Sequence, residues 1–307
     1  MAKEIKKDEI KQFNLQVDTD FNVKKLEKAQ RVGKIISYVI IYFLLLLLAV
    51  AILFPFYWMI NSSLKTLDEY KLANPTFVPR QIYWRNYAEA FKTANLGILF
   101  LNTLYVGIVS TVLSLVVTVV SAFAFARLEF KGKNILFAGL LATMMIPGEL
   151  FTITNYATVK VYFGWGNTFM ALIVPFLVSV FYIYLLRQNF LQIPNELYLA
   201  AKVDGTSDLK YLLRVMVPLS LPTLISITIL KMMGAWNSYI WPRLVANDIP
   251  HSMVTNGLRN AFQANDGTTD YPKQMAAVAI VSIPLFVVFI CLRKYIMKGV
   301  SRSGIKG

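Results

Sequence analysis

Few residues in this sequence have side chains suited to covalent or metal chemistry. The 307 residues include one histidine, His251, and one cysteine, Cys291. A disulfide within the chain and a Cys- or His-rich metal site are therefore excluded, and no nucleophile–His–acid set is evident. The sequence also has no Gly-x4-Gly-Lys-Ser/Thr loop for nucleotide phosphates. We expect the chain to be no enzyme and to bind no metal or cofactor itself.

The residues best suited to a function form a polar island, Pro194–Gly205, between two hydrophobic segments. Its composition predicts a short helix over residues 195–202, with Asn195 as the N-cap and Glu196 in the first turn, where a negative charge suits the helix dipole. Gly205 is predicted to end this helix as its C′ residue. A second amphipathic stretch follows over Leu209–Val217. This pattern favours a helix-turn-helix that docks on another protein, and an ordinary loop is the alternative.

Composition identifies the kind of protein that carries the island. Hydrophobic residues make up 56% of the chain, charged residues 16%, and the mean hydropathy is +0.54. A soluble domain cannot bury that much apolar surface, so we expect an all-α polytopic membrane protein. The net charge of +14 could indicate nucleic acid binding, but its distribution favours a membrane surface, and no nucleic acid partner is expected.

Six apolar segments are long enough to cross a hydrocarbon core of about 30 Å. They cover residues 35–60, 97–125, 134–153, 168–186, 219–241 and 275–292. With the N-terminus inside, 21 of the 31 Lys and Arg residues lie in inner segments and nine in outer ones. The positive-inside rule then puts both termini and the polar island in the cytosol. The predicted organisation is a cytosolic arm (1–34), a six-helix membrane domain (35–298) containing the loop 187–218, and a cytosolic tail (299–307).

Motifs along most of the chain match one known family. A loop pattern of Glu-Ala-Ala, then Gly, then Ile/Val-x-Leu-Pro falls on Ala200, Ala201, Asp204, Gly205, Pro218 and Pro222. Other matches are Asn61–Lys65, Asn86-Tyr87, Asn102-Thr103, Ala122–Arg127, Met145–Pro147, Trp236-Asn237, Trp241-Pro242 and the tail Gly299–Gly307. In their order and spacing, residues 35–307 resemble the permease subunits of type I ABC carbohydrate importers, and specifically those related to the second maltose permease subunit.

The resemblance implies a mechanism and a set of partners. In such importers the cytoplasmic loop forms a coupling helix that sits in a cleft of an ATPase subunit, so closure of the ATPase dimer tilts the permease helices. It implies coupling roles for Glu196, Ala200, Ala201, Asp204 and Gly205. The implied partners are a second permease subunit, two copies of an ABC ATPase that bind ATP and Mg, a solute-binding protein, an oligosaccharide and membrane lipid. A bacterial inner or plasma membrane is the implied location.

The loop also departs from the family pattern. Leu199 stands where the family usually has the glutamate before the paired alanines. A salt bridge from that position to the ATPase is therefore not expected. Glu196, three residues earlier, could supply a neighbouring contact, and docking is expected to depend more on apolar burial.

Candidate substrate-path residues are fewer and carry competing interpretations. Lys231 lies within a predicted span, where an ionisable residue usually faces a cavity or a partner. It could pair with an anionic substrate such as a uronic-acid oligosaccharide, pair with a carboxylate of the partner permease, or snorkel. Trp236 and Asn237 could stack on and hydrogen-bond a sugar, or pack between spans. Glu149, beside Pro147, could line a pore or an outer interface.

The outer loop between the fifth and sixth spans, Pro242–Lys273, is polar and rich in turn residues. By the resemblance it reaches into the solute-binding protein, with Asn256, Arg259 and Asn260 as candidate contacts; a simple connection is the alternative. Two other functions stay open. One is a permease for a non-sugar solute such as a glycerophosphodiester or polyol. The other is a secondary transporter, which should show mid-membrane carboxylates and inverted repeats; we find only Glu149 near a span and no repeat.

Overall fold

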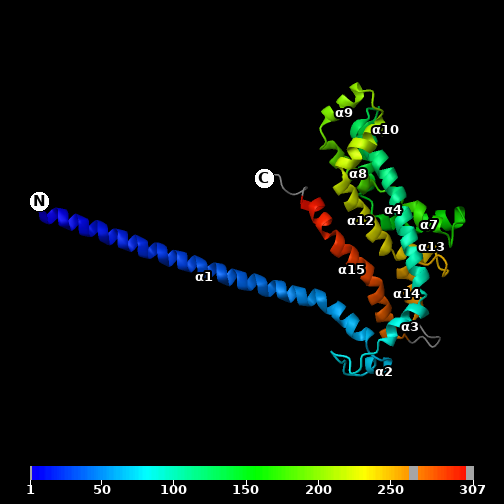
Figure 1. Ribbon diagram of the computed structural model, residues 1–307, viewed down its shortest axis with the longest axis horizontal. Helices are drawn as coiled ribbons and strands as arrows, with labels where there is room; N and C mark the ends of the chain where they lie inside the picture. Colours follow the sequence, from blue (N-terminus) through cyan, green and yellow to red (C-terminus); the bar gives the residue numbers. More distant parts are fainter. Residues whose placement is uncertain (1, 263–268, 302–307) are drawn as a thin grey trace. The chain divides into compact units, whose positions relative to one another are not determined.

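The computed structural model describes residues 2–262 and 269–301, with side chains described for residues 28, 30–258, 261, 262 and 269–291. The chain divides into two compact units, one up to Met59 and one from Ile60 onward. The described residues form helices joined by short loops (Figure 1). The all-α prediction is therefore confirmed. Residues 302–307 of the predicted tail lie outside the described residues.

The first unit is a single helix. Helix α1 (Ala2–Ser63) is continuous and contains Pro55, and its last residues belong to the second unit. Residues Gln30–Ser63 form its candidate membrane span, and an 18-residue window within it has a mean hydropathy of 3.0. The predicted first span, 35–60, lies inside that range. The helix also continues toward the N-terminus through most of the predicted arm.

The second unit contains the remaining elements. In chain order these are α2 (Leu67–Tyr70), α3 (Arg85–Thr93), α4 (Leu96–Arg127), α5 (Lys133–Thr143), η1 (Gly148–Phe151), α6 (Thr152–Tyr156), η2 (Ala157–Tyr162), α7 (Phe169–Ile173), η3 (Val174–Phe176), α8 (Val180–Leu191), α9 (Asn195–Val203), α10 (Asp208–Tyr211), η4 (Leu212–Met216), α11 (Val217–Leu219), α12 (Leu221–Trp236), α13 (Ile240–Val245), α14 (Val254–Ala261) and α15 (Tyr271–Ser301).

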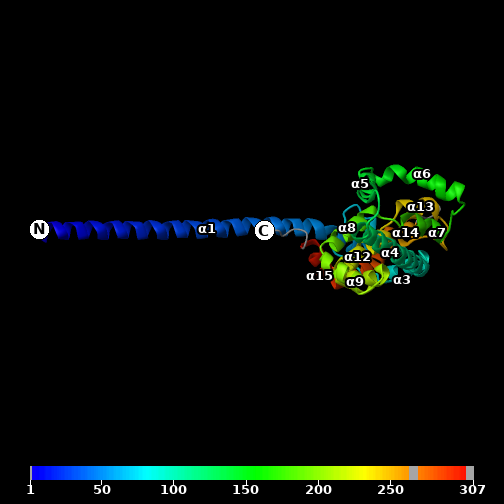
Figure 2. The same cartoon turned by 90° about the horizontal axis from the view of Figure 1, so that it is seen from above.

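Three candidate spans are unbroken helices and three are bent. The unbroken ones are Gln30–Ser63, Leu96–Arg127 and Tyr271–Cys291. The bent ones are Lys133–Thr143 with Gly148–Tyr162 (85°), Phe169–Phe176 with Val180–Leu191 (45°), and Asp208–Leu219 with Leu221–Trp236 (80°). Figure 2 shows the turn between α5 and α6. Counting each bent pair as one span gives the six that the sequence predicts.

The predicted boundaries of the third, fourth and fifth spans differ from the structure. The fourth, 168–186, ends before α8, which continues to Leu191. The third predicted span, 134–153, stops short, because helix resumes after the break at Pro147 and continues to Tyr162. The fifth, 219–241, runs too far: α12 ends at Trp236 with Asn237 as its C-cap, and α13 is a separate short helix. Hydropathy follows the apolar residues and does not detect the polar pair Asn237-Ser238 that ends α12.

Helix α4 is the central element of the second unit, with α8 and α12 packed along it (Figure 1). Small residues permit this close packing. A Cβ atom on Gly107 would lie 3.0 Å from the Met232 sulfur on α12. After Gly107 along the same helix, small hydroxyl side chains are buried at Ser110, Thr111, Ser114 and Thr118. These small residues therefore let the helices approach closely at this point.

A buried polar network closes the segment after α1. Glu69 accepts hydrogen bonds from Thr76 Oγ1 (2.7 Å) and the Arg80 N–H (2.9 Å), and Lys65 Nζ donates to the Thr76 carbonyl (2.5 Å). Asn86 Nδ2 donates to the carbonyls of Ser63 and Lys65 at 2.9 and 2.7 Å. The Asn61–Lys65 and Asn86-Tyr87 motifs thus hold one structure together through the hydrogen bonds of Asn86 and Lys65.

The ionisation of Glu69 is tuned by this network. Burial alone would raise the pKa of Glu69, but the hydrogen bonds from Thr76 and Arg80 and the positive charges of Lys65 and Arg80 outweigh it, so the pKa lies below its usual value. A carboxyl whose pKa is lowered on folding adds stability above its unfolded pKa of about 4.3 and loses that contribution as the pH falls through the folded pKa.

We predict that Glu69→Gln lowers the thermal unfolding temperature of the purified protein near neutral pH and flattens its decrease between about pH 5 and pH 3. The neighbouring exposed carboxyl gives the control, Asp68→Asn, which should leave both quantities near the wild-type values. Equal behaviour of the two variants would contradict a structural role for the Glu69 charge.

Candidate functional site

The predicted coupling helix exists as α9, and the prediction of its N-cap needs a correction. Its N-cap is Pro194, which has no side-chain capping bond, so the prediction that Asn195 is the N-cap is wrong. A proline at this position fixes the chain direction instead. Glu196 lies in the first turn, as predicted.

The C-terminal end of α9 confirms the predicted role of Gly205. This residue has φ +69°, a left-handed conformation that glycine adopts without steric cost. The N–H of Thr206 donates to the Ala201 carbonyl at 2.8 Å and that of Gly205 to the Lys202 carbonyl at 3.0 Å. These two bonds form a Schellman motif. The helix therefore ends sharply and the chain turns toward α10.

One face of α9 packs on the rest of the unit. Tyr198 and Ala201 contact the buried cluster that includes Phe123, Phe190 and Tyr211. The Tyr198 hydroxyl donates to Asp208 Oδ1 at 2.8 Å, and Lys202 Nζ lies 2.6 Å from the same oxygen. The hydrogen bond that Lys202 donates to Asp208 raises the pKa of Lys202. The contacts fasten α9 to α10.

The opposite face of α9 is exposed. Glu196, Leu199, Ala200 and Val203 follow the i, i+3, i+4, i+7 spacing of one helix face. All four are exposed, with Leu199 at 55% and Val203 at 88%. The structure thus separates the paired alanines, since Ala200 is on the exposed face and Ala201 on the packed one. Asp204, the C-cap, is also exposed.

Two arginines that sequence reasoning did not single out hold the start of this loop. Arg127, at the end of α4, is buried and donates from Nη2 to the carbonyls of Phe190 (3.0 Å) and Ile193 (2.5 Å). Arg187 Nε on α8 donates to the Phe125 carbonyl at 3.0 Å. Carbonyls at the C-terminal end of a helix lack intrahelical donors and favour a cation. Arg127 belongs to a quoted motif, which was the available signal.

The candidate substrate-path residues are not brought together. Lys231 lines a cavity of about 330 Å³, here named the Lys231 cavity, between α4, the η3–α8 break and α12. Trp236 is buried against Phe100, with ring centroids 5.8 Å apart, and with Asn237 it lines a different cavity of about 470 Å³. Glu149 is exposed in η1 at the α5–α6 break. These residues are therefore not parts of one site within this chain.

The candidate binding-protein contacts differ in how far they can be placed. Asn256 on α14 is buried and donates from Nδ2 to the Ala246 carbonyl at 3.3 Å. It also lines an outer cavity of about 540 Å³ together with Asn95, Arg243 and Asn247. The side chains of Arg259 and Asn260 lie outside the described ones. Asn256 thus supports the loop from inside.

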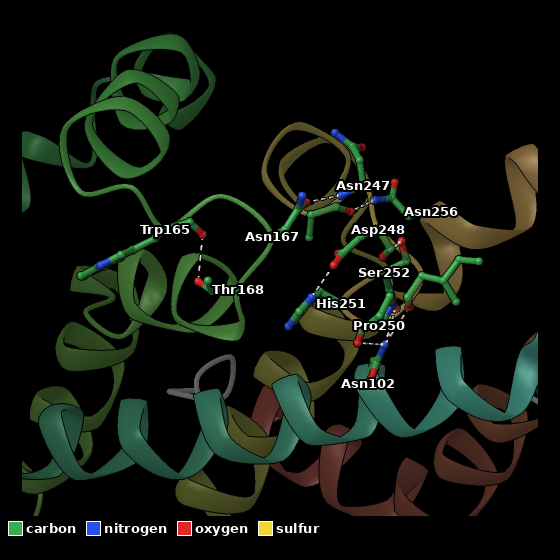
Figure 3. A network of polar contacts seen from close by, with 12 residues as sticks. Asn102, Trp165, Asn167, Thr168, Asn247, Asp248, Pro250, His251, Ser252 and Asn256 are labelled. Atoms are coloured by element: carbon green, nitrogen blue, oxygen red, sulfur yellow. Dashed lines mark hydrogen bonds and ion pairs between the residues drawn. The ribbon is translucent and has the colours of Figure 1, made fainter.

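The Asn102-Thr103 motif anchors the loop before α14 to α4, and Figure 3 shows the Asn102 contacts. Asn102 Nδ2 donates to the carbonyls of Pro250 (2.9 Å) and Ser252 (3.0 Å), and Thr103 Oγ1 accepts from the Val254 N–H at 2.9 Å. The His251 ring contacts Asp248, with Nδ1 2.8 Å from Oδ2. The single histidine is therefore part of the loop structure.

The fold and the loop geometry agree with the family comparison. Residues 115–302 match the family described as "Binding-protein-dependent transport system inner membrane component". This range covers more than half of the chain and includes α8, α9, α12 and the described part of the outer loop. The chain belongs to this family. It is a membrane-spanning component of a binding-protein-dependent ABC transport system.

Relatives align over most of the chain. The sn-glycerol-3-phosphate transport system permease protein UgpE of Pectobacterium atrosepticum is 27% identical over 82% of this chain and 92% of its own length. The arabinooligosaccharides transport system permease protein AraQ of Bacillus subtilis is 27% identical over 85% of this chain and 93% of its own. The diacetylchitobiose uptake system permease protein NgcG of Streptomyces coelicolor is 27% identical over 85% and 86%.

A solved structure has the same fold. A chain from a bacterial ABC transporter involved in the import of the acidic polysaccharide alginate superposes with a TM-score of 0.75. The sequence identity is 22%, and the match covers 87% of this chain and 97% of that one. The permease fold that the sequence predicts is thereby confirmed.

The Gly205 conformation generates a prediction about α9. In Gly205→Ala the added Cβ meets no atom within 4 Å, so the cost is the left-handed conformation itself, about 1–2 kcal/mol. We expect faster amide hydrogen exchange at residues 205 and 206, because their bonds to Lys202 and Ala201 open more often. Gly205→Asn is the matched variant, since asparagine tolerates this conformation better, and its exchange should remain closer to wild type. Equally fast exchange in both would contradict the account.

Proposed function

We propose that this chain is one permease subunit of an ATP-driven importer for an oligosaccharide. It forms the translocation path with a second permease, receives solute from a solute-binding protein, and is driven by two ATPase subunits that bind ATP and Mg. The relatives named for arabinooligosaccharides and diacetylchitobiose support a sugar substrate. The chain itself carries out no bond chemistry.

The observation that carries the proposal is the exposed apolar face of α9. Leu199 and Val203 lie on a helix that is bonded to its neighbours on the other side. An exposed apolar surface on a fixed helix favours binding to a protein. We infer that the ATPase covers the face formed by Glu196, Leu199, Ala200 and Val203, and that burial of Leu199 replaces the salt bridge of the family's usual glutamate.

The coupling then follows from differential binding. Nucleotide shifts the permease only if the ATPase contacts differ between the two permease conformations. Movement of α9 passes into the bundle through Arg127, which joins the end of α4 to the α8–α9 connection, and through the Tyr198–Asp208 bond. Asp204 and Gly205 fix the direction in which the chain leaves α9.

The membrane orientation is part of the same proposal. The Lys and Arg distribution favours both termini and α9 in the cytosol of a bacterial cell, with the α13–α14 region outside. The outer loop is held on α4 by Asn102 and Thr103. We propose that this region contacts the solute-binding protein, with Arg259 and Asn260 as candidate contact residues, and that buried Asn256 supports it.

A second candidate substrate also has support. The UgpE relative is named for sn-glycerol-3-phosphate and matches this chain at the same 27% identity as the sugar permeases. A permease for a glycerophosphodiester or polyol therefore remains an alternative. A secondary transporter has less support, because the family to which the chain belongs works with a binding protein.

Uptake by cells that express the complete transporter, with and without this chain, tests the proposal. We expect loss of the chain to abolish accumulation of one radiolabelled oligosaccharide in a panel of neutral and uronate-containing sugars, and re-expression to restore it. Loss of sn-glycerol-3-phosphate uptake with all sugars unaffected would replace the proposal by the alternative.

A further inference from the structure

The Lys231 cavity contains a positive charge that no acidic group of the described chain neutralises. Lys231 Nζ donates to the Phe176 carbonyl at 2.5 Å, and among the described residues no carboxylate forms an ion pair with it. None of the described residues that line the cavity is acidic. A charged side chain within a span is costly and usually faces a partner or a polar ligand. The carbonyl satisfies one of the three ammonium donors and leaves the charge unpaired.

A second positive element borders the same cavity. The fourth span is broken by 45° between Phe176 and Val180, so the 12-residue helix α8 begins inside the bundle. Ser179, its N-cap, lines the cavity and accepts the Tyr182 N–H at 3.4 Å. Among the described residues, no acceptor binds the N–H groups of Val180 and Phe181. The N-terminus of a broken span favours a negative charge.

The remaining lining suits a hydroxylated ligand. Ser110, Ser238 and Tyr182 contribute hydroxyl groups, and Phe176 and Trp241 contribute rings whose centroids are 5.5 Å apart. The Trp241 Nε1 is already bonded to the Ala171 carbonyl at 2.9 Å, so this ring is fixed. The volume of about 330 Å³ is at the small end of ligand pockets, which suits one sugar unit rather than a whole oligosaccharide.

We propose that the Lys231 cavity is a subsite for a hydroxylated anion, with Lys231 as its counter-charge, and that the anion is the carboxylate of one acidic sugar unit. The α8 N-terminus adds to the attraction, and the serine and tyrosine hydroxyls bind the ring hydroxyls. The inference rests on the proposed import function and specifies its substrate class. It also gives Lys231 a role separate from Trp236 and Asn237, which line another cavity.

The test uses the complete transporter, reconstituted with its solute-binding protein, and three probes: a neutral oligosaccharide, a uronate-containing oligosaccharide of the same length, and sn-glycerol-3-phosphate. Lys231→Met removes the charge, and Lys231→Arg keeps it. Lys160→Met is the matched control, since Lys160 lies in η2 near the Tyr156 ring and outside this cavity. KM and maximal rate of transport are measured for each variant and probe.

We expect Lys231→Met to raise the KM for the uronate probe about tenfold or more, in the range of one lost hydrogen bond to a charged group. The neutral probe should be unaffected, Lys231→Arg should retain most uronate transport, and Lys160→Met should resemble wild type. The same charge dependence for sn-glycerol-3-phosphate instead of the uronate would keep the anion subsite and assign it to a phosphate ligand.

Two outcomes would overturn the inference while the import function stands. Equal loss for neutral and acidic probes, with weaker co-purification of the second permease, would make Lys231 an intersubunit or structural contact. Unchanged KM for every probe would show that the charge does not meet the substrate. Failure of the proposed function itself is distinct, since the wild-type transporter would then move none of the carbohydrate probes.

Discussion

The bond between Arg127 and the carbonyl end of α8 is the interaction on which the account depends most. Arg127 is buried at the end of the central helix, and its guanidinium bonds to Phe190 and Ile193 just before the chain enters α9. Without it, the buried Ile193 carbonyl would lose its donor, and the Phe190 carbonyl would keep only its local backbone bond from the Ile193 N–H at 3.3 Å. Helix α9 is attached to the chain on one face and exposed on the other, the arrangement that the proposed coupling role requires.

The same solution recurs at other places where the helices are interrupted. Backbone groups released by a break must be satisfied inside the protein, because the hydrocarbon core offers no water. Lys231 binds the Phe176 carbonyl at the break before α8, and Ser179 caps the helix that follows. In the same way, Asn102 and Thr103 bind the backbone of the loop before α14, and Figure 3 shows Asn102 beside Pro250 and Ser252. Polar side chains on α4 and on the bent spans themselves thus bind the backbone at these interruptions.

Sequence patterns predicted the features that depend on local chemistry. Long apolar runs gave the spans, and Gly205 gave the end of α9, because few residues other than glycine adopt its backbone conformation. The positions of helix breaks, and which face of a helix is packed, were harder to predict from sequence. The continuation of the third span to Tyr162 and the separation of Ala200 from Ala201 depend on tertiary packing, which hydropathy does not contain. Arg127 was noticed only within a motif, since its acceptors are more than 60 residues away. Lys231 and Trp236 were grouped by proximity in sequence, but they line different cavities.

Site-specific cross-linking of α9 to the ATPase tests the central claim most directly. Cys291, which is exposed, is replaced by serine, and single cysteines are placed at Ala200 or Ala201 in the assembled transporter. The account predicts that Ala200→Cys cross-links to the ATPase subunit and that Ala201→Cys, which faces the chain's own core, does so far less. Efficient cross-linking from position 201 with none from position 200, or none from either, would contradict docking through the exposed face of α9.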